Sequence, residues 1–204
     1  ERDADGRSGL KQLAINSPDA TAVNMAYADL CLADENYQEA EPIADHLLSL
    51  DWENTVARIA KARCVFLKGD ADRAKKLIYD MIDTVTNGNA LVNRLHDILR
   101  VWNEKLIVDY EAKEDKTQDE WIKLGWCYLQ NDMIDEGLAM TKELKPKEIE
   151  DLYTYHNFMA KILYSAELHD QVIPHLDWIY EYLRSLPDPE EAEQSAEEKT
   201  GTEE

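Results

Sequence analysis

The strongest constraint on the fold of this chain is an internal period of 34 to 35 residues. Placing Ala40 over Ala74 aligns two segments 34 residues apart, and Gly125 and Ala160 align two later segments 35 residues apart. Self-similarity at this period is typical of arrays that repeat one helical hairpin. A single hairpin cannot bury its own apolar face, so neighbouring hairpins must stack to form a continuous core.

Short amphipathic helices account for almost everything from residue 18 to residue 186, and no segment shows the sustained alternation of a strand. Turn residues set the expected ends. Ser17-Pro18 predicts a helix start and Asp51 an N-cap. Gly69 suits a left-handed helix exit, and Thr117 with Glu120 predicts a capping box. The expected helices cover residues 18–33, 37–50, 52–68, 71–85, 90–112, 118–129, 133–143, 147–165 and 171–183.

One segment carries a recognisable signature. In the sequence from 121 to 128, Trp121, Leu124, Gly125 and Tyr128 resemble the W-x2-L-G-x2-Y signature of the tetratricopeptide (TPR) repeat at all four positions. The small residues Ala28, Ala62 and Ala160 occupy the slot of Gly125 in the other repeats. The resemblance implies an all-α fold, a right-handed superhelical array of antiparallel helix pairs (a TPR-like α-solenoid) with one long central helix.

The repeat boundaries follow from this alignment. We expect two TPR-like repeats in residues 17–88 and two more in residues 118–187. Residues 1–16 are either the end of a preceding repeat or a flexible lead. The repeats themselves are placed at 21–54, 55–88, 118–152 and 153–187, and residues 188–204 are expected to form an acidic disordered tail.

Two features depart from the family pattern. Residues 89–117 are too few for a full repeat, so the long helix predicted there is a degenerate repeat or a spacer, and the groove is continuous or split accordingly. Pro42 and Pro174 share one repeat position inside the nominal second helix. Those helices must either start late, which would place proline in the unbonded first turn, or kink.

Composition excludes several classes of function. With 43 acidic and 22 basic residues the formal charge is −21, which disfavours binding to nucleic acid or to an anionic membrane surface. The apolar runs are too short to predict a transmembrane helix. The three cysteines, Cys31, Cys64 and Cys127, have no CxxC spacing, so buried thiols in a reducing, cytoplasmic compartment are expected.

Motifs for catalysis and for cofactor binding are lacking in the sequence. It contains no glycine-rich phosphate loop, no G-x-S-x-G elbow and no H-E-x-x-H. His169 and His175 lie near two aspartates but lack the i,i+4 spacing that puts two metal ligands on one helical face. Cys31 and Cys127 lie on apolar helix sides, where a packed thiol is expected. We therefore expect no enzyme, no metal and no cofactor.

Function must then come from the surface. In proteins that this chain resembles, the first helix of each pair lines a concave groove that holds a peptide or helix. The resemblance places the following residues at groove positions: Met25, Asp29, Ile59, Arg63, Phe66, Ile122, Trp126, Asn157, Lys161 and Tyr164. Leu32 and Leu129 occupy groove positions that are also compatible with the core. Met25 and Asp29 stand where a carboxylate-clamp TPR has Lys and Asn, so an apolar or mildly basic partner segment is expected.

Three functional hypotheses remain open. The first is a protein–protein interaction scaffold with no catalysis of its own. The second is a regulatory TPR segment of a larger multidomain protein, either an enzyme or a co-chaperone. The third is self-association as a homodimer through the long helix, whose apolar stripe includes Leu95, Trp102 and Leu106.

Overall fold

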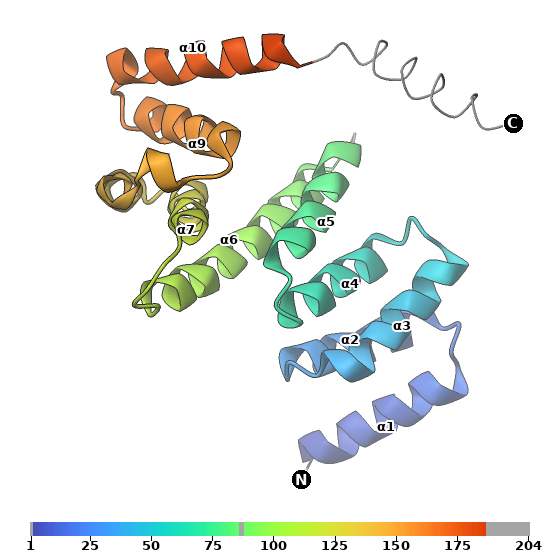
Figure 1. The fold of residues 1–204 in the computed structure, drawn as a ribbon. Coiled ribbons are helices and arrows are strands. Elements are labelled where there is room, and N and C mark those ends of the chain that lie inside the picture. Colours follow the sequence, from blue (N-terminus) through green and yellow to red (C-terminus); the bar gives the residue numbers. More distant parts are fainter. Residues whose placement is uncertain (1, 86–87, 187–204) are drawn as a thin grey trace, which may run out of the picture. The chain divides into compact units, whose positions relative to one another are not determined.

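The structure, a computed structural model, describes residues 2–85 and 88–186, and this part of the chain is helical without strands. Figure 1 shows the helices in chain order. Their bounds are α1 (Arg2–Asn16), α2 (Thr21–Ala33), α3 (Tyr37–Leu50), α4 (Thr55–Leu67), α5 (Ala71–Thr84), α6 (Asn89–Glu111), α7 (Gln118–Gln130), α8 (Ile134–Met140), α9 (Leu152–Ser165) and α10 (His169–Ser185), with 3₁₀ turns η1 (Thr141–Glu143) and η2 (Pro146–Glu148) after α8. The predicted acidic tail at 188–204 lies outside the described residues.

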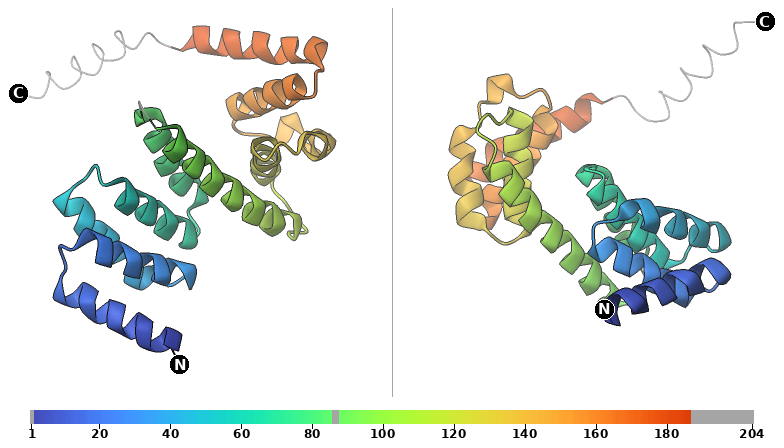
Figure 2. Two further views of the ribbon diagram at one scale, coloured as in Figure 1. Left: turned by 180° about the vertical axis from the view of Figure 1, so that it is seen from behind. Right: turned by 90° about the horizontal axis from the view of Figure 1, so that it is seen from below.

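The chain divides into two compact units, Glu1–Leu99 and Arg100–Glu204. The long helix α6 belongs to both, with residues 89–99 in the first unit and residues 100–111 in the second. It is one continuous helix with no hairpin partner in the described part of 89–117. The two views in Figure 2 show the helices of each unit packed against their neighbours in sequence.

Four helical hairpins close in the same way. Each first helix is followed by a residue with positive φ: Glu35 (56°), Gly69 (91°), Asp132 (58°) and Glu167 (60°). The amide one residue later bonds a carbonyl five residues back, in the pairs Asn36–Cys31, Asp70–Val65, Met133–Tyr128 and Leu168–Leu163. This is the hydrogen-bond pattern of a Schellman C-cap, and it confirms the left-handed exit predicted at Gly69. The hairpin turns therefore repeat with the period of the sequence.

Side-chain caps fix most helix starts. The capping box of Thr117 and Glu120 is confirmed. The N-cap predicted at Asp51 is wrong, because Asp51 ends α3 and Asn54 caps α4 by accepting from the Ala57 amide. The start predicted at residue 147 is also wrong. There the chain makes the 3₁₀ turn η2, and α9 begins at Leu152 behind Asp151.

The start predicted at Ser17-Pro18 is wrong because a helix already occupies residues 2–16. Pro18 lies in the turn between α1 and α2, and α2 begins at Thr21. The buried Asn24 holds this turn, since its Nδ2 donates to the carbonyls of Ser17 (2.8 Å), Pro18 (2.9 Å) and Ala20 (3.0 Å). Residues 2–16 therefore form a helix that packs on α2.

Small residues let the helices of the first unit approach closely. Helix α4 packs on both α2 and α3. The shared core has alanine at nearly every crossing, with Leu32 and Leu47 filling the space between. Its alanines include Ala28, Ala40, Ala44, Ala57 and Ala60. Because alanine adds little bulk, the backbones of these three helices can pack against one another directly.

In the second unit, glycine replaces alanine where α9 crosses α7 and α8. A Cβ on Gly125 would lie 2.8 Å from both the Met140 Sδ and the Phe158 Cε2 atoms, and a Cβ on Gly137 would lie 2.9 Å from the Ile162 Cδ1 atom. Gly125 is thus required by the Phe158 ring, whereas at Gly137 the close atom is the end of the flexible Ile162 side chain. The core of the second unit also includes Leu124, Tyr128 and Tyr155.

Both repeat prolines lie inside their helices. Pro42 is the sixth residue of α3 and Pro174 the sixth residue of α10, so the alternative of a late helix start is wrong. The apolar stripe of α6 is engaged within the chain. Leu95 and Trp102 are buried, and Leu106 packs against the core of the second unit. The stripe is therefore not an exposed face, which removes the basis for the predicted homodimer through α6.

Candidate functional site

The predicted groove residues separate into three groups. Met25, Ile59 and Ile122 are buried, so the expectation that they line an open groove is wrong. Met25 belongs to the core formed by α2, α3 and α4, and Ile122 to the core of the second unit. A neighbouring helix covers these positions, which the periodicity of a single helix cannot reveal.

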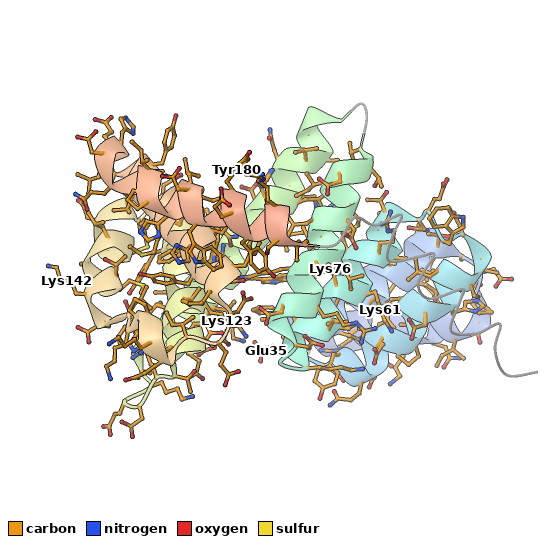
Figure 3. The ribbon with its side chains drawn as sticks, turned by 45° about the horizontal axis from the view of Figure 1, so that its top comes forward. Glu35, Lys61, Lys76, Lys123, Lys142 and Tyr180 are labelled. Carbon is orange, nitrogen blue, oxygen red and sulfur yellow. The ribbon has the colours of Figure 1, made fainter. Side chains whose placement is uncertain are left out.

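The exposed members in the first unit engage one another. Asp29 on α2 accepts a hydrogen bond from Arg63 on α4, with 3.0 Å between Oδ1 and Nη1. Lys61, labelled in Figure 3, reaches from α4 to Glu41 (3.0 Å) and Asp45 (2.6 Å) on α3. Hydrogen bonds from Lys68 and Lys61 hold the pKa of Glu41 below its ordinary value. These ion pairs connect α4 to α2 and α3. Phe66, the third groove residue expected on α4, is half-buried.

The members in the second unit meet at a pocket of about 600 Å³. It is lined by α7, α9 and α10, and five of the residues predicted at groove positions belong to its wall: Trp126, Leu129, Asn157, Lys161 and Tyr164. The Lys161 ammonium lies over the Trp126 ring, 5.5 Å from its centroid. The Trp126 ring also contacts the buried Phe158 ring, with 5.7 Å between ring centroids. The pocket therefore combines a half-buried indole with one cation.

Sequence reasoning missed the third wall of the pocket. Leu176 and Ile179 on α10 complete the pocket together with Val172. The TPR alignment assigned the groove to first helices alone, so no residue of a second helix was considered. The signal that could have found these residues is a constant offset of 132 residues, which relates α9 and α10 to α2 and α3.

This offset holds across the whole hairpin without a gap. It pairs the small residues Ala28 and Ala160, the positive-φ residues Glu35 and Glu167, and the prolines Pro42 and Pro174. It also pairs the apolar residues that face the next helix, namely Leu32 with Tyr164, Ala44 with Leu176 and Leu47 with Ile179. The two hairpins are therefore equivalent, residue for residue.

The equivalent residues differ in what covers them. Leu32 and Ala44 are 4% and 0% exposed because α4 packs on α2 and α3. Tyr164 and Leu176 are 66% and 51% exposed. Exposed apolar side chains continue along α10, where Figure 3 labels Tyr180, and at the residue that follows the helix. They are Ile173, Tyr180, Leu183 and Leu186. The surface formed by the pocket and these residues is called the α9/α10 face below.

A group of stacked rings joins α9 and α10 beside this face. His156 lies parallel to Trp178, with ring centroids 4.2 Å apart, and Trp178 stacks on Tyr182 at 5.2 Å. The Nδ1 atoms of His156 and His175 are 3.0 Å apart. Burial lowers the pKa of both histidines, and the neighbouring charge of His175 lowers that of His156 further. One ring therefore donates to a neutral partner.

The histidines and cysteines do not form a further chemical site in the part of the chain that the structure describes. Within the described residues, no three His, Cys, Asp or Glu side chains come together as metal ligands. His169 begins α10, as expected, and its ring contacts Tyr164 at 5.3 Å between centroids. All three cysteines are buried, which confirms the packed thiols expected at Cys31 and Cys127. No helix in the described ranges has the length and apolar character needed to cross a membrane.

Comparison with known proteins gives no match. No protein-family model matches the sequence, and searches against curated proteins and against solved structures return no significant similarity.

Proposed function

We propose that this chain is a protein-interaction scaffold that binds a peptide or helix of a partner protein in the pocket between α7, α9 and α10, with no catalysis of its own. The observation that carries the proposal is the convergence of Trp126, Lys161 and Tyr164, predicted groove residues, on one pocket. Large rigid side chains of this kind supply much of the energy of protein interfaces.

We further propose that the helix pairs are repeats of TPR type, stacked as an α-solenoid. Support comes from the signature at 121–128, from the 34 to 35 residue period and from the common closure of the four hairpins. A regulatory segment of a larger multidomain protein would use the same pocket, so this alternative makes the same prediction for binding.

The extent of the apolar surface favours a protein partner. Apolar side chains of α10 lie exposed beyond the pocket over several turns, and include Ile173, Tyr180 and Leu183. Contiguous apolar surface of this kind marks interaction sites in folded proteins. The segment that binds it must be apolar on one face, and mildly basic flanks would suit a chain whose formal charge is −21.

Affinity capture from a lysate of cells that express the chain, followed by titration of the purified partner, tests this proposal. Tyr164→Ala and Trp126→Ala should each weaken binding by about 1–3 kcal/mol. Tyr164 is the sharper probe, since its exposure predicts an unchanged fold. Trp52→Ala is the matched control, because Trp52 is 71% exposed and lies in the first unit. Equal affinity for wild type and both pocket variants would refute the proposal.

A further inference from the structure

We infer that the occupant of the α9/α10 face is an amphipathic helix of the partner, seated as α4 is seated on α2 and α3, with an acidic residue facing Lys161 and a basic residue facing Asp177. This inference rests on the proposed function and specifies the partner segment. It follows from the equivalence of the two hairpins and from what covers one of them.

Helix α4 shows the kind of element that fits such a face. It presents Ala57, Ala60 and Cys64 to the core shared with α2 and α3. These residues are spaced three and four apart, so they form one stripe along the helix. Small side chains on the stripe let the helix sit deeply between the two helices of the hairpin. The α9/α10 face has larger residues, Tyr164 and Leu176, at equivalent positions, so its occupant needs an equally small stripe.

The charges around the stripe give the occupant its polarity. In the first unit, Arg63 of α4 faces Asp29 and Lys61 faces Glu41 and Asp45. The 132-residue offset replaces Asp29 by Lys161, Glu41 by Ile173 and Asp45 by Asp177. The charge that faces Arg63 is thus reversed in sign. Of the two acids that face Lys61, the first becomes apolar and the second is kept. The partner helix must carry an acid where α4 has Arg63 and a cation where α4 has Lys61.

The residues that follow in the sequence do not meet these requirements. Residues 187–204 contain no aromatic or large aliphatic side chain, and eight carboxylates stand against one lysine. A segment of this composition has no apolar stripe to bury. Residues 187–204 are therefore not the occupant of the α9/α10 face.

A peptide designed on α4 tests the inference with the full chain. It has the sequence of residues 54–69, acetylated and amidated, with Cys64→Ala against oxidation and with Ile59→Gln and Val65→Gln for solubility. The charge-matched peptide adds Arg63→Glu, and the control peptide keeps Arg63. Binding to wild type and to Lys161→Glu is measured by fluorescence anisotropy at low salt, and circular dichroism checks that the variant is folded.

The expected result is a reciprocal preference. Wild type should bind the charge-matched peptide about two- to five-fold more tightly than the control, and Lys161→Glu should reverse the order by a similar factor. Tyr164→Ala should weaken both peptides. No saturable binding to wild type up to about 1 mM would overturn the inference.

Two other outcomes would also overturn it. Equal binding of both peptides, still sensitive to Tyr164→Ala, would refute the charge arrangement while leaving the pocket as a binding site. Sedimentation equilibrium that shows a dimer dissociated by Leu176→Glu would make a second copy of the chain the occupant. If the captured partner binds the pocket and neither peptide does, the proposed function stands, and the inference that the occupant is a helix seated like α4 is refuted.

Discussion

Replacing Gly125 by alanine places a methyl group where the core of the second unit has no room. The added Cβ would lie 2.8 Å from the Met140 Sδ atom and 2.8 Å from the Phe158 Cε2 atom. Phe158 is fully buried, so its ring cannot rotate into solvent to make room. Helix α9 must therefore shift away from α7, or the ring must leave its preferred rotamer.

Two opposing effects determine the size of the change. Alanine is a better helix former than glycine by about 1 kcal/mol, which alone would stabilise α7. Overpacking a well-filled core costs about 1–3 kcal/mol, and here side chains on two helices, Met140 on α8 and Phe158 on α9, must both move. The expected net effect of Gly125→Ala is a destabilisation of about 1–2 kcal/mol. For a unit of this size, the melting temperature falls by about 4–8 °C per kcal/mol.

Urea and thermal unfolding, followed by circular dichroism, measure this effect. Gly9→Ala is the matched control, because Gly9 lies in α1 with no atom within 4 Å of an added Cβ, and that variant should gain up to about 1 kcal/mol. Adding Phe158→Leu to Gly125→Ala should recover part of the loss, since the smaller side chain makes room. The packing argument is refuted if Gly125→Ala stabilises the chain as much as Gly9→Ala.

The structure also predicts how stability depends on pH, on the positive-φ residue Glu167 and on the buried Asn24. Burial lowers the pKa of His156 and His175, so the unfolded chain binds more protons below about pH 6.5, and stability should fall with decreasing pH from about 7 to 5, by at most about 1.4 kcal/mol per pH unit per histidine. The urea midpoint of the double variant His156→Gln/His175→Gln should change less with pH over that range than the midpoint of wild type. Glu167→Gly should raise the melting temperature, because a residue other than glycine at φ 60° costs about 1 kcal/mol. Asn24→Ala should lower stability by about 1–3 kcal/mol in urea unfolding, because it leaves the turn carbonyls between α1 and α2 without their donor.

Local chemistry made several helix ends predictable, but only where one cap had no rival. Gly69 and Thr117 act through bonds to residues close in sequence, and the structure has both as predicted. Asp51 and Ser17 are equally good cap residues on their own. In the structure Asn54 caps α4 instead of Asp51, and Ser17 lies in a turn that Asn24 holds. The packing of the neighbouring helix determines where the chain can bend, so the cap residue alone does not fix the helix start.

The candidate site was predictable in part for a similar reason. The repeat alignment found the α7 and α9 walls of the pocket, including Trp126 and Tyr164. It also selected Met25 and Ile122, which are buried, because exposure at a given helical position depends on the next helix. Leu176 was missed because the alignment took groove positions from the first helix of each pair and Leu176 lies on a second helix. Only the structure shows that nothing in the described residues covers it.

Hydrogen exchange by mass spectrometry shows which helices of the chain a bound partner protects. Wild type is compared with and without its captured partner, and exchange is followed along every helix. If the partner binds the α9/α10 face, the exchange rates of the amides of α9 and α10 should fall by about tenfold or more, because a ligand stabilises the structure that it contacts. The exchange rates of the amides of α2 and α3 should not change. Protection confined to the first unit, or a complex with no protection in α7, α9 and α10, would contradict it.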